Sequence, residues 1–485
     1  MDLREEKIKK LEKLKSSKIN PYPNRVKRTH TLKEIREDFE KLSEGKKEII
    51  IAGRIKLIRK HGKATFIDLE DFGGNLQIYL KEEILGKANY QLFQETIDLG
   101  DFLEVKGVLF LTKTQEKTLK ASEWRVLAKT LMPLPEKWHG LVEVEARFRQ
   151  RYLDLLSNKD VREIFLKRSL LIKLIREFFD SRGFIEVETP TLQPIPGGAI
   201  AKPFVTHHQA LDLDLYLRIA PELYLKKMLV GGFEKVYEIA RCFRNEGIDR
   251  AHNPEFTQIE FYEAYKDYNG LMNLTEELMG FLLEKTKTNS LINYQGRKIN
   301  LAPPYPRLSY RESLIKYAGL DIEKIKGQEL RKKAEELKIE LKDEWDDFKI
   351  LEEVFKEKVR SKIDNPVFII DHPLEISPLA KKTEYSPNYV ERFQLLIAGL
   401  EITNAYSEIN DPLDQRERMK QQQELLERGD EEAQRIDEDF LSALEYGMPP
   451  AAGEGIGLDR LISIFCDVHN LKEVILFPTM RPKTS

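Results

Sequence analysis

The fold is decided by the stretch Arg241-Cys-Phe-Arg244-Asn-Glu246-Gly and, close behind it, His252-Asn-Pro-Glu255-Phe256-Thr-Gln-Ile-Glu260-Phe-Tyr262. This stretch is predicted to be a β-hairpin that carries cations, anions, an imidazole and an aromatic ring. Because side chains alternate faces along a strand, Arg244 and Glu246 are expected to point the same way, as are Glu260 and Tyr262. An Arg beside a Glu on one face can hold a phosphate and a base edge, which predicts a nucleotide site.

Composition limits the class of protein. A chain of 485 residues is too long for one core and predicts about two to four domains. With 41% hydrophobic and 33% charged residues it has the composition of a globular protein, and a formal net charge of −3 argues against a polybasic binder. The first residues are richer in Lys and Arg than in Asp and Glu, which fits either a solvated helix face or a nucleic-acid contact.

The cysteines and the hydropathy pattern predict the compartment. Cys242 and Cys466 cannot form a disulfide framework or a Cys-rich zinc site. The N-terminus has no apolar signal core, and no run of residues approaches a membrane span. We therefore expect a cytoplasmic protein that has neither a membrane nor DNA as a partner.

The residue pattern predicts an α+β protein with several parts. Residues 1–45 are expected to be a helical extension, and 46–131 to hold about five strands with a helix between the third and fourth, typical of an OB-fold β-barrel. A proline-rich linker is expected at 132–140. A second domain follows at 141–485, with a charged, mainly helical insertion at about 270–360.

Several elements of the second domain can be predicted individually. Val161–Asp180 has the spacing of an amphipathic helix, and Phe184–Thr189 alternates like a strand that Pro190 ends. The apolar runs Val367–Ile370 and Val474–Phe477 are predicted to be central strands.

Three segments, in this order, resemble the signature motifs of the class II aminoacyl-tRNA synthetases. The helix, strand and Pro190 resemble motif 1, the stretch quoted first resembles motif 2, and Gly453-Glu-Gly455-Ile-Gly457-Leu-Asp459-Arg460-Leu resembles motif 3. One glycine-rich stretch is a weak signal, whereas three ordered motifs behind a barrel cover nearly the whole chain. The resemblance implies a catalytic domain built on an antiparallel β-sheet flanked by helices, and a homodimer.

Within that class the chain is similar to the lysine-specific enzymes of subclass IIb. The similar segments are Pro196-Gly-Gly-Ala, Lys202-Pro-Phe-Val-Thr-His-His208, Arg218-Ile-Ala-Pro-Glu222-Leu-Tyr-Leu-Lys and Glu401-Ile-Thr-Asn404-Ala-Tyr406-Ser-Glu408-Ile-Asn-Asp411-Pro. This similarity implies ATP-dependent ligation of L-lysine to the 3′ end of tRNA(Lys) through a lysyl-adenylate. Lysine, ATP and tRNA(Lys) are then the expected partners, and AMP and pyrophosphate the products.

The resemblance assigns a nucleotide pocket to motifs 2 and 3. Arg244 and Arg460 are the expected catalytic residues, the first on the α-phosphate and the second over the adenine and the γ-phosphate. Glu246 is expected to accept from the adenine amino group and Phe256 to stack on the base. His252 is expected to contact the outer phosphates. Each residue alone also fits an ordinary structural role, such as a buried Arg–Glu pair.

A magnesium ion is the expected cofactor, because charge builds on the leaving pyrophosphate. Glu401 matches a family metal ligand in the ATP site, and Glu408 is a further predicted ligand. Gln394 stands where the family usually has Glu, and its amide oxygen binds Mg²⁺ more weakly than a carboxylate. Glu454, an acid inside motif 3, is expected to be a surface-facing turn residue; a charge near the metal is the alternative.

The amino-acid pocket is expected to replace the water around the substrate's ε-ammonium with two acids, Glu222 and Glu408, and with Tyr262. A basic group between the two acids, or their placement in separate cavities, would overturn the assignment to lysine. Two acids also argue against an aspartyl or asparaginyl enzyme. Glu260 and the backbone near Gly198 are expected to hold the α-amino end. The full predicted set is Gly198, Glu222, Arg244, Glu260, Tyr262, Asn404, Tyr406 and Glu408.

Strand parity leaves one question open. Asn404, Tyr406 and Glu408 alternate, so on a strand they share a face, but Glu401 has the opposite parity to Asn404. Either a bulge lies between them or they serve different faces.

Four residues of the barrel match family positions that read a U-rich anticodon: Arg59, Phe66, Gln77 and Glu116. Phe66 can stack on a splayed base, and Gln77 can pair with a base edge. Phe66 also fits a place in the barrel core.

Two other functions stay open. A protein-modifying lysine ligase uses the same adenylate chemistry but usually lacks an anticodon domain. An inactive, RNA-binding homologue would be expected to lose Arg244 or Arg460, and both are present.

Overall fold

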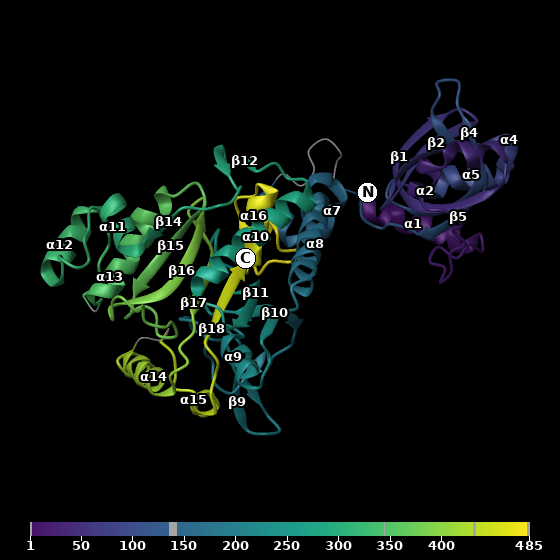
Figure 1. Ribbon diagram of the computed structural model, residues 1–485. Coiled ribbons are helices and arrows are strands. Elements are labelled where there is room, and N and C mark those ends of the chain that lie inside the picture. The colour runs from purple at the N-terminus through teal and green to yellow at the C-terminus, as the bar shows by residue number, and fades with distance from the viewer. Residues whose placement is uncertain (1, 135–142, 344, 430–432, 483–485) are drawn as a thin grey trace. The chain divides into compact units, whose positions relative to one another are not determined.

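The computed structural model describes residues 2–134, 143–343, 345–429 and 433–482 (Figure 1). Contacts divide the chain into two compact units, Met1–Leu141 and Val142–Ser485. Most of the linker predicted at 132–140 lies within 135–142, which is outside the described residues. Within the described ranges, no helix is both long and apolar enough to cross a membrane.

The first unit contains a closed barrel with the strand order β1-β2-β3-β5-β4. Inward-facing apolar side chains fill it, among them Ile67, Leu69 and Ile78, because alternate residues of each strand point to its interior. The predicted OB-type barrel is confirmed. Its elements are α1 (Leu3–Ser16), α2 (Leu32–Glu37), α3 (Phe39–Glu44), β1 (Ile49–His61), β2 (Ala64–Asp71), β3 (Gly74–Lys81), α4 (Glu82–Leu85), α5 (Lys87–Thr96), β4 (Phe102–Leu111) and β5 (Lys117–Ala128).

The second unit is built on an eight-stranded sheet in the order β14-β15-β16-β17-β18-β11-β10-β6. The central pairs are antiparallel, as predicted, and the edge pairs β14–β15 and β6–β10 are parallel. Its strands are β6 (Ile185–Glu186), β10 (Lys235–Phe243), β11 (Glu255–Ala264), β14 (Arg307–Ser309), β15 (Val367–Pro373), β16 (Tyr389–Ile397), β17 (Leu400–Ser407) and β18 (Ala451–Gly457). A separate sheet has the order β7-β9-β8, with β7 (Leu192–Gln193), β8 (Val205–His208) and β9 (Leu213–Leu217).

The two faces of the large sheet differ in chemistry. One face packs on α8 (Lys159–Asp180), α10 (Tyr268–Thr286) and α16 (Leu458–Cys466), and together they bury the main core (Figure 1). Phe261, Phe393 and Ile456 point to that face. The residues beside them in sequence point to the other face and are polar or glycine, which leaves that face free for a site.

The region predicted as a helical insertion contains helices with a hydrophobic core of their own, including Leu314, Leu330 and Ile350. It also holds a β-hairpin that the sequence pattern had not indicated. Its elements after α10 are β12 (Leu291–Tyr294), β13 (Arg297–Asn300), α11 (Tyr310–Ala318), α12 (Gly327–Glu336), α13 (Asp347–Val354) and the π-helical turn Phe355–Val359. The other helices of the unit are α6 (Val144–Arg149), α7 (Arg151–Ser157), α9 (Glu222–Val230), α14 (Pro412–Glu427) and α15 (Glu438–Glu445).

One strand prediction is wrong, and another is too long. Val474–Phe477 forms turns although Val474 is fully buried. The guanidinium of Arg151 takes the place of a neighbouring strand, because it donates to the backbone carbonyls of Lys472 and Leu476 at 2.7 and 3.1 Å. The strand predicted at Phe184–Thr189 shrinks to β6, whose two residues pair with β10, and the Val187 N–H then donates to the Tyr237 carbonyl at 2.9 Å.

Candidate active site

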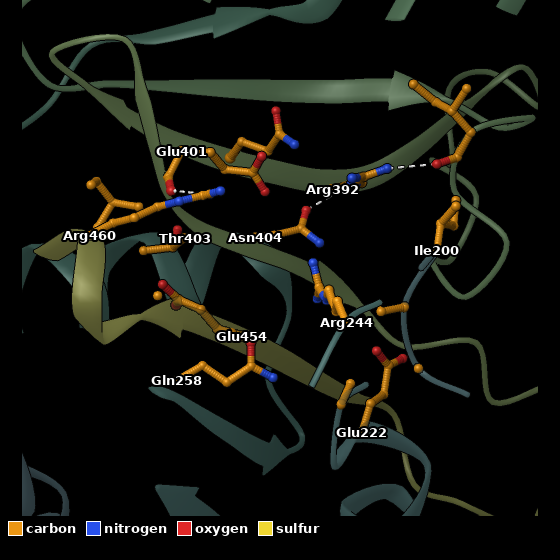
Figure 2. A pocket seen from close by; sticks show the side chains of 18 of the residues that line it. Ile200, Glu222, Arg244, Gln258, Arg392, Glu401, Thr403, Asn404, Glu454 and Arg460 are labelled. Carbon is orange, nitrogen blue, oxygen red and sulfur yellow. Dashed lines mark hydrogen bonds between the residues drawn. The ribbon is translucent and has the colours of Figure 1, made fainter. Parts of the chain in front are cut away.

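A cavity of about 650 Å³ opens on the polar face of the large sheet (Figure 2). Loops, helix α9 and the insertion complete its walls. Glu408 is not among the described residues that line it. Every other residue predicted for ATP, amino acid or metal contributes to the lining: Gly198, Glu222, Arg244, Glu246, His252, Phe256, Glu260, Tyr262, Gln394, Glu401, Asn404, Tyr406 and Arg460.

Arg244 and Glu246 lie in a loop. Strand β10 ends at Phe243 and β11 begins at Glu255, so the prediction that both side chains share a strand face is wrong. The Arg244 backbone N–H donates to the Pro254 carbonyl at 2.9 Å and closes the base of the loop. The Arg244 guanidinium lies over the Phe256 ring, 5.0 Å from its centroid. Its buried Nε has no hydrogen-bond partner within the described chain, as expected of a group that meets an anion.

Arg460 lies in the first turn of α16 and faces the same cavity. It donates to the Glu401 carbonyl at 3.0 Å, and its other nitrogen is 3.4 Å from His252 Nε2. Burial lowers the pKa of Arg460, although Glu401 opposes that shift. Arg360, which the sequence analysis missed, approaches the Glu401 carboxylate to 3.7 Å. The cavity thus presents several guanidinium groups to an anionic ligand.

Strand β18 contributes Gly453, Gly455 and Gly457 to the lining of the cavity. Gly453, Gly455 and Gly457 of β18 pair with Tyr262, Glu260 and Gln258 of β11. A Cβ at Gly453 would overlap the Tyr262 ring and the Glu408 carboxylate. Gly453 therefore lets the Glu408 carboxylate and the Tyr262 ring approach the sheet closely.

A β-bulge answers the question of strand parity. The β16–β17 register shifts between Leu395 and Leu396, which pair with Thr403 and Glu401. The extra residue on β17 restores parity, so that Glu401 and Asn404 both reach the cavity (Figure 2). The amide of Asn404 is held by Arg392, which donates to it at 2.9 Å. Sequence spacing alone cannot reveal a bulge.

Two acids converge, as predicted, but a lysine lies between them. Lys226 Nζ is 2.7 Å from Glu222 Oε1 and 2.5 Å from Glu408 Oε2, and the lysine side chain is completely buried. The expectation that no basic group separates the acids is therefore wrong. Burial lowers the pKa of Lys226, but the two carboxylates outweigh it and raise that pKa above its usual value. Burial also raises the pKa of Glu408 to about 8, against the effect of Lys226. The helical spacing of Glu222 and Lys226 was the available signal.

Glu260 forms a second acidic position in the cavity, and the charge of Arg244 acts on it. Gln258 donates to it at 2.6 Å and the Tyr262 hydroxyl at 3.2 Å. Burial raises the pKa of Glu260 well above its usual value, and the charge of Glu222 adds to the shift. The same-face prediction for Glu260 and Tyr262 on β11 matches this contact.

Glu454 is buried, so its prediction as a surface-facing turn acid is wrong. It lies in β18 on the core face of the sheet, opposite Phe261, and is 1% exposed. The Thr275 hydroxyl on α10 is 2.7 Å from its carboxylate and 2.9 Å from the Leu271 carbonyl. Burial raises the pKa of Glu454 to about 8. A protonated Glu454 can donate to Thr275, whose own proton then goes to Leu271.

The three predicted metal ligands, Glu401, Gln394 and Glu408, do not form one site. Glu401 and Gln394 line the cavity, and the buried amide oxygen of Gln394 has no hydrogen-bond partner among the residues described. Glu408 is held by Lys226 instead. In the described part of the chain no group of three or more His, Cys, Asp or Glu side chains is arranged to hold a metal. One carboxylate and one free amide oxygen fit a Mg²⁺ ion whose remaining ligands are water and phosphate.

The residues predicted to bind the anticodon lie on the outside of the barrel in the first unit. Arg59 donates to Gln77 at 3.0 Å, and the Gln77 amide donates to Thr118 at 3.1 Å. Phe66 is not in the barrel core; its ring centroid lies 4.9 Å from that of Tyr79 on the neighbouring strand. Glu116 is exposed in the turn before β5. These side chains form an outward-facing polar and aromatic surface.

Comparisons with known families cover both units. Residues 143–481 match the family described as tRNA synthetases class II (D, K and N). Residues 49–127 match the OB-fold nucleic acid binding domain.

Similar proteins extend over almost the full chain. A lysine–tRNA ligase of Moorella thermoacetica is 49% identical over 483 residues, which cover 99% of this chain and 98% of the relative. Lysine–tRNA ligases of Carboxydothermus hydrogenoformans and Pelotomaculum thermopropionicum are each 50% identical; both matches cover 98% of this chain, and 97% and 94% of the relatives.

Proposed function

Because this chain belongs to the lysine–tRNA ligase family of class II tRNA synthetases, we propose that it activates L-lysine with ATP and transfers it to the 3′ end of tRNA(Lys). The observation that carries the proposal is the Glu222 carboxylate, which faces a cavity whose nucleotide end carries Arg244 and Arg460. Lys226 does not exclude a lysine substrate, because Glu222 still points to the cavity and is free to bind an ammonium (Figure 2).

The first step is in-line attack of the lysine carboxylate on the α-phosphorus of ATP, which forms lysyl-adenylate and releases pyrophosphate. Arg244 neutralises the charge that develops on the α-phosphate, and Phe256 stacks on the adenine. Arg460 and His252 bind the outer phosphates. The site accelerates the reaction by positioning and by charge neutralisation, since it needs no covalent intermediate with the protein.

The second step transfers the acyl group. The 3′-hydroxyl of the terminal adenosine attacks the acyl carbon of the adenylate and gives its proton to a phosphate oxygen of AMP, which leaves with the bonding electrons of the broken acyl–phosphate bond. Glu260 and the backbone near Gly198 hold the α-amino group through both steps. Asn404 and Tyr406 complete the amino-acid pocket on β17.

Magnesium is part of the proposal. When bound, Mg²⁺ supplies charge neutralisation at the leaving pyrophosphate. Glu401 and Gln394 are the residues that would hold it. Glu408 is left out of this metal site, because Lys226 holds its carboxylate, and it acts on the amino-acid pocket through Lys226.

The proposal extends to the partners of the chain. Arg59, Phe66, Gln77 and Glu116 read the anticodon of tRNA(Lys). Two copies associate as a homodimer, and the cytoplasm is the compartment.

The test is lysine-dependent exchange of labelled pyrophosphate into ATP, followed by charging of purified tRNA(Lys). We expect both activities with lysine, and neither with aspartate or asparagine at the same concentration. Exchange without charging would favour a protein-modifying ligase. Failure of both, in a protein that binds ATP, would contradict the proposal.

A further inference from the structure

Lys226 is a buried cation that the expected chemistry leaves without a task. It lies on α9, one helical turn after Glu222, and its ammonium bridges Glu222 to Glu408. The ammonium also lies 5.4 Å from the Tyr406 ring centroid and 5.9 Å from that of Phe440. Carboxylates and aromatic faces thus compensate the charge that burial would otherwise make unfavourable.

The contacts of Glu222 are directional. Its Oε1 accepts from Lys226 at 2.7 Å and from the Tyr406 hydroxyl at 2.5 Å. Both donors therefore hold the same oxygen of the carboxylate, while the Glu222 side chain lines the cavity (Figure 2). A carboxylate fixed in this way presents its second oxygen to a ligand without a further loss of rotamer freedom.

Glu408 differs from Glu222 in its access to ligand. It is 1% exposed and does not belong to the described lining of the cavity. Glu408 contacts Lys226, and it therefore affects the cavity through the Lys226 ammonium. The order from the cavity inward is therefore Glu222, Lys226, Glu408.

We propose that Lys226 is a positioning residue for amino-acid recognition: its ammonium fixes the Glu222 carboxylate toward the cavity, where that carboxylate binds the ammonium of the substrate side chain. The inference rests on the proposed function for the identity of the substrate. The nucleotide end of the cavity is built by other elements, namely the β10–β11 loop and α16, so Lys226 should not affect ATP directly.

Lys226→Ala tests this proposal, because it deletes the equivalent of a propylammonium ion and leaves a slot between two acids. We expect the KM for lysine in pyrophosphate exchange to rise about tenfold or more, with the KM for ATP within about twofold of the parent. Propylamine added to the variant should lower the lysine KM again. Propan-1-ol, which has a similar shape without charge, should not, and this difference separates a counter-ion from a space-filling role.

Lys227→Ala is the matched control. Lys227 follows Lys226 directly but points outward to an ion pair with Asp439 at 2.5 Å. We expect parental constants for both substrates and no response to propylamine.

Thermal melting is a second test of the proposal if Lys226→Ala folds poorly. If Lys226→Ala loses its cooperative transition and propylamine restores it while propan-1-ol does not, the slot for an ammonium is supported. An unchanged lysine KM, or an amine that alters neither KM nor melting, would overturn the proposal. Absence of lysine-dependent exchange in the parent would instead overturn the proposed function, and the melting response would still report on the slot.

Discussion

Tyr406 and Lys226 hold one carboxylate oxygen of Glu222, and Glu222 lines the cavity, so its charge should dominate recognition of an ammonium. Glu222→Gln keeps the shape and removes the charge. We expect the lysine KM in pyrophosphate exchange to rise roughly 100-fold, because a charge-assisted hydrogen bond is lost. This change corresponds to about 3 kcal/mol of binding free energy. The KM for ATP is the internal control and should stay near the parental value. Equal lysine constants for variant and parent would remove Glu222 from the pocket.

Glu454 should make the stability of the protein depend on pH. Its pKa in the folded state is about 8, above that of an unfolded Glu, so the folded state binds the proton more tightly. The stability present at acidic pH is therefore lost as the pH rises toward and through 8. Glu454→Gln imitates the protonated acid, because its amide can donate to Thr275, and it should remove this loss.

The measurement is the melting temperature of parent and variant between pH 5 and pH 9. We expect the variant to be more stable at alkaline pH by on the order of 3–5 kcal/mol, and the difference to shrink at acidic pH. Parallel curves would show that Glu454 is not neutral in the folded protein. Since Glu260 and Glu408 also titrate, only the difference between the two proteins is informative.

Sequence reasoning predicts the residues of this site that lie in its motifs and misses those that come from elsewhere. Glu260 and Tyr262 follow from alternation along one strand. Arg360 does not, because it comes from the insertion, outside the motifs. Lys226 ends a segment quoted in the sequence, but its contact with Glu408 depends on where the fold brings that distant acid. Glu454 was misjudged because a glycine-rich stretch resembles a turn, whereas its long-range pairing with β11 and β17 makes it a central strand.

Strand β18 depends on the absence of side chains from its cavity face. Gly453→Ala would place a methyl group into the Tyr262 ring and the Glu408 carboxylate. We expect a loss of about 1–3 kcal/mol in the free energy of unfolding, measured in urea, because overpacking must displace β11 or β18. Gly457→Ala is the control for stability, since its Cβ would come no closer than 3.7 Å to a neighbouring atom. Similar losses for both variants would show that the close contact at Gly453 is not the cause of the destabilisation.

Strands β2 and β3 present Phe66 and Tyr79 on the outer surface of the barrel. If a base of tRNA stacks there, Phe66→Ala should weaken RNA binding by about 1–3 kcal/mol and depress charging accordingly. Pyrophosphate exchange should be unchanged, since it needs no RNA. Equal losses in charging and exchange would indicate misfolding instead.

Helices and strands were predictable where the hydrophobic periodicity continues over several repeats. The five barrel strands and α8 each keep their pattern over several repeats. The strand prediction for Val474–Phe477 is wrong because an apolar run shows only that its side chains are buried. It does not show which group binds the backbone carbonyls, and here Arg151 of α7 binds carbonyls in and beside this segment. The β17 bulge has no signature in the spacing, since one inserted residue looks like an ordinary change of phase.

The two units have separate cores, so damage to one should spare the chemistry of the other. Leu103 on β4 is completely buried in the barrel. Leu103→Ala should destabilise the first unit by about 2–5 kcal/mol, lower the first thermal transition, and reduce tRNA charging. Lysine-dependent exchange should persist at temperatures where the barrel has melted. Simultaneous loss of exchange and barrel structure would show that the units unfold together.

The order of charges from Glu222 through Lys226 to Glu408 has a consequence for inhibitors of this pocket. A compound that copies lysine and is then lengthened past Glu222 meets an ammonium before it meets the second carboxylate. A second amine on such a compound would be repelled, whereas a terminal hydroxyl or carboxylate could accept from Lys226. Potency at the deep end of the cavity should therefore come from acceptors, although the pocket as a whole selects for a cation.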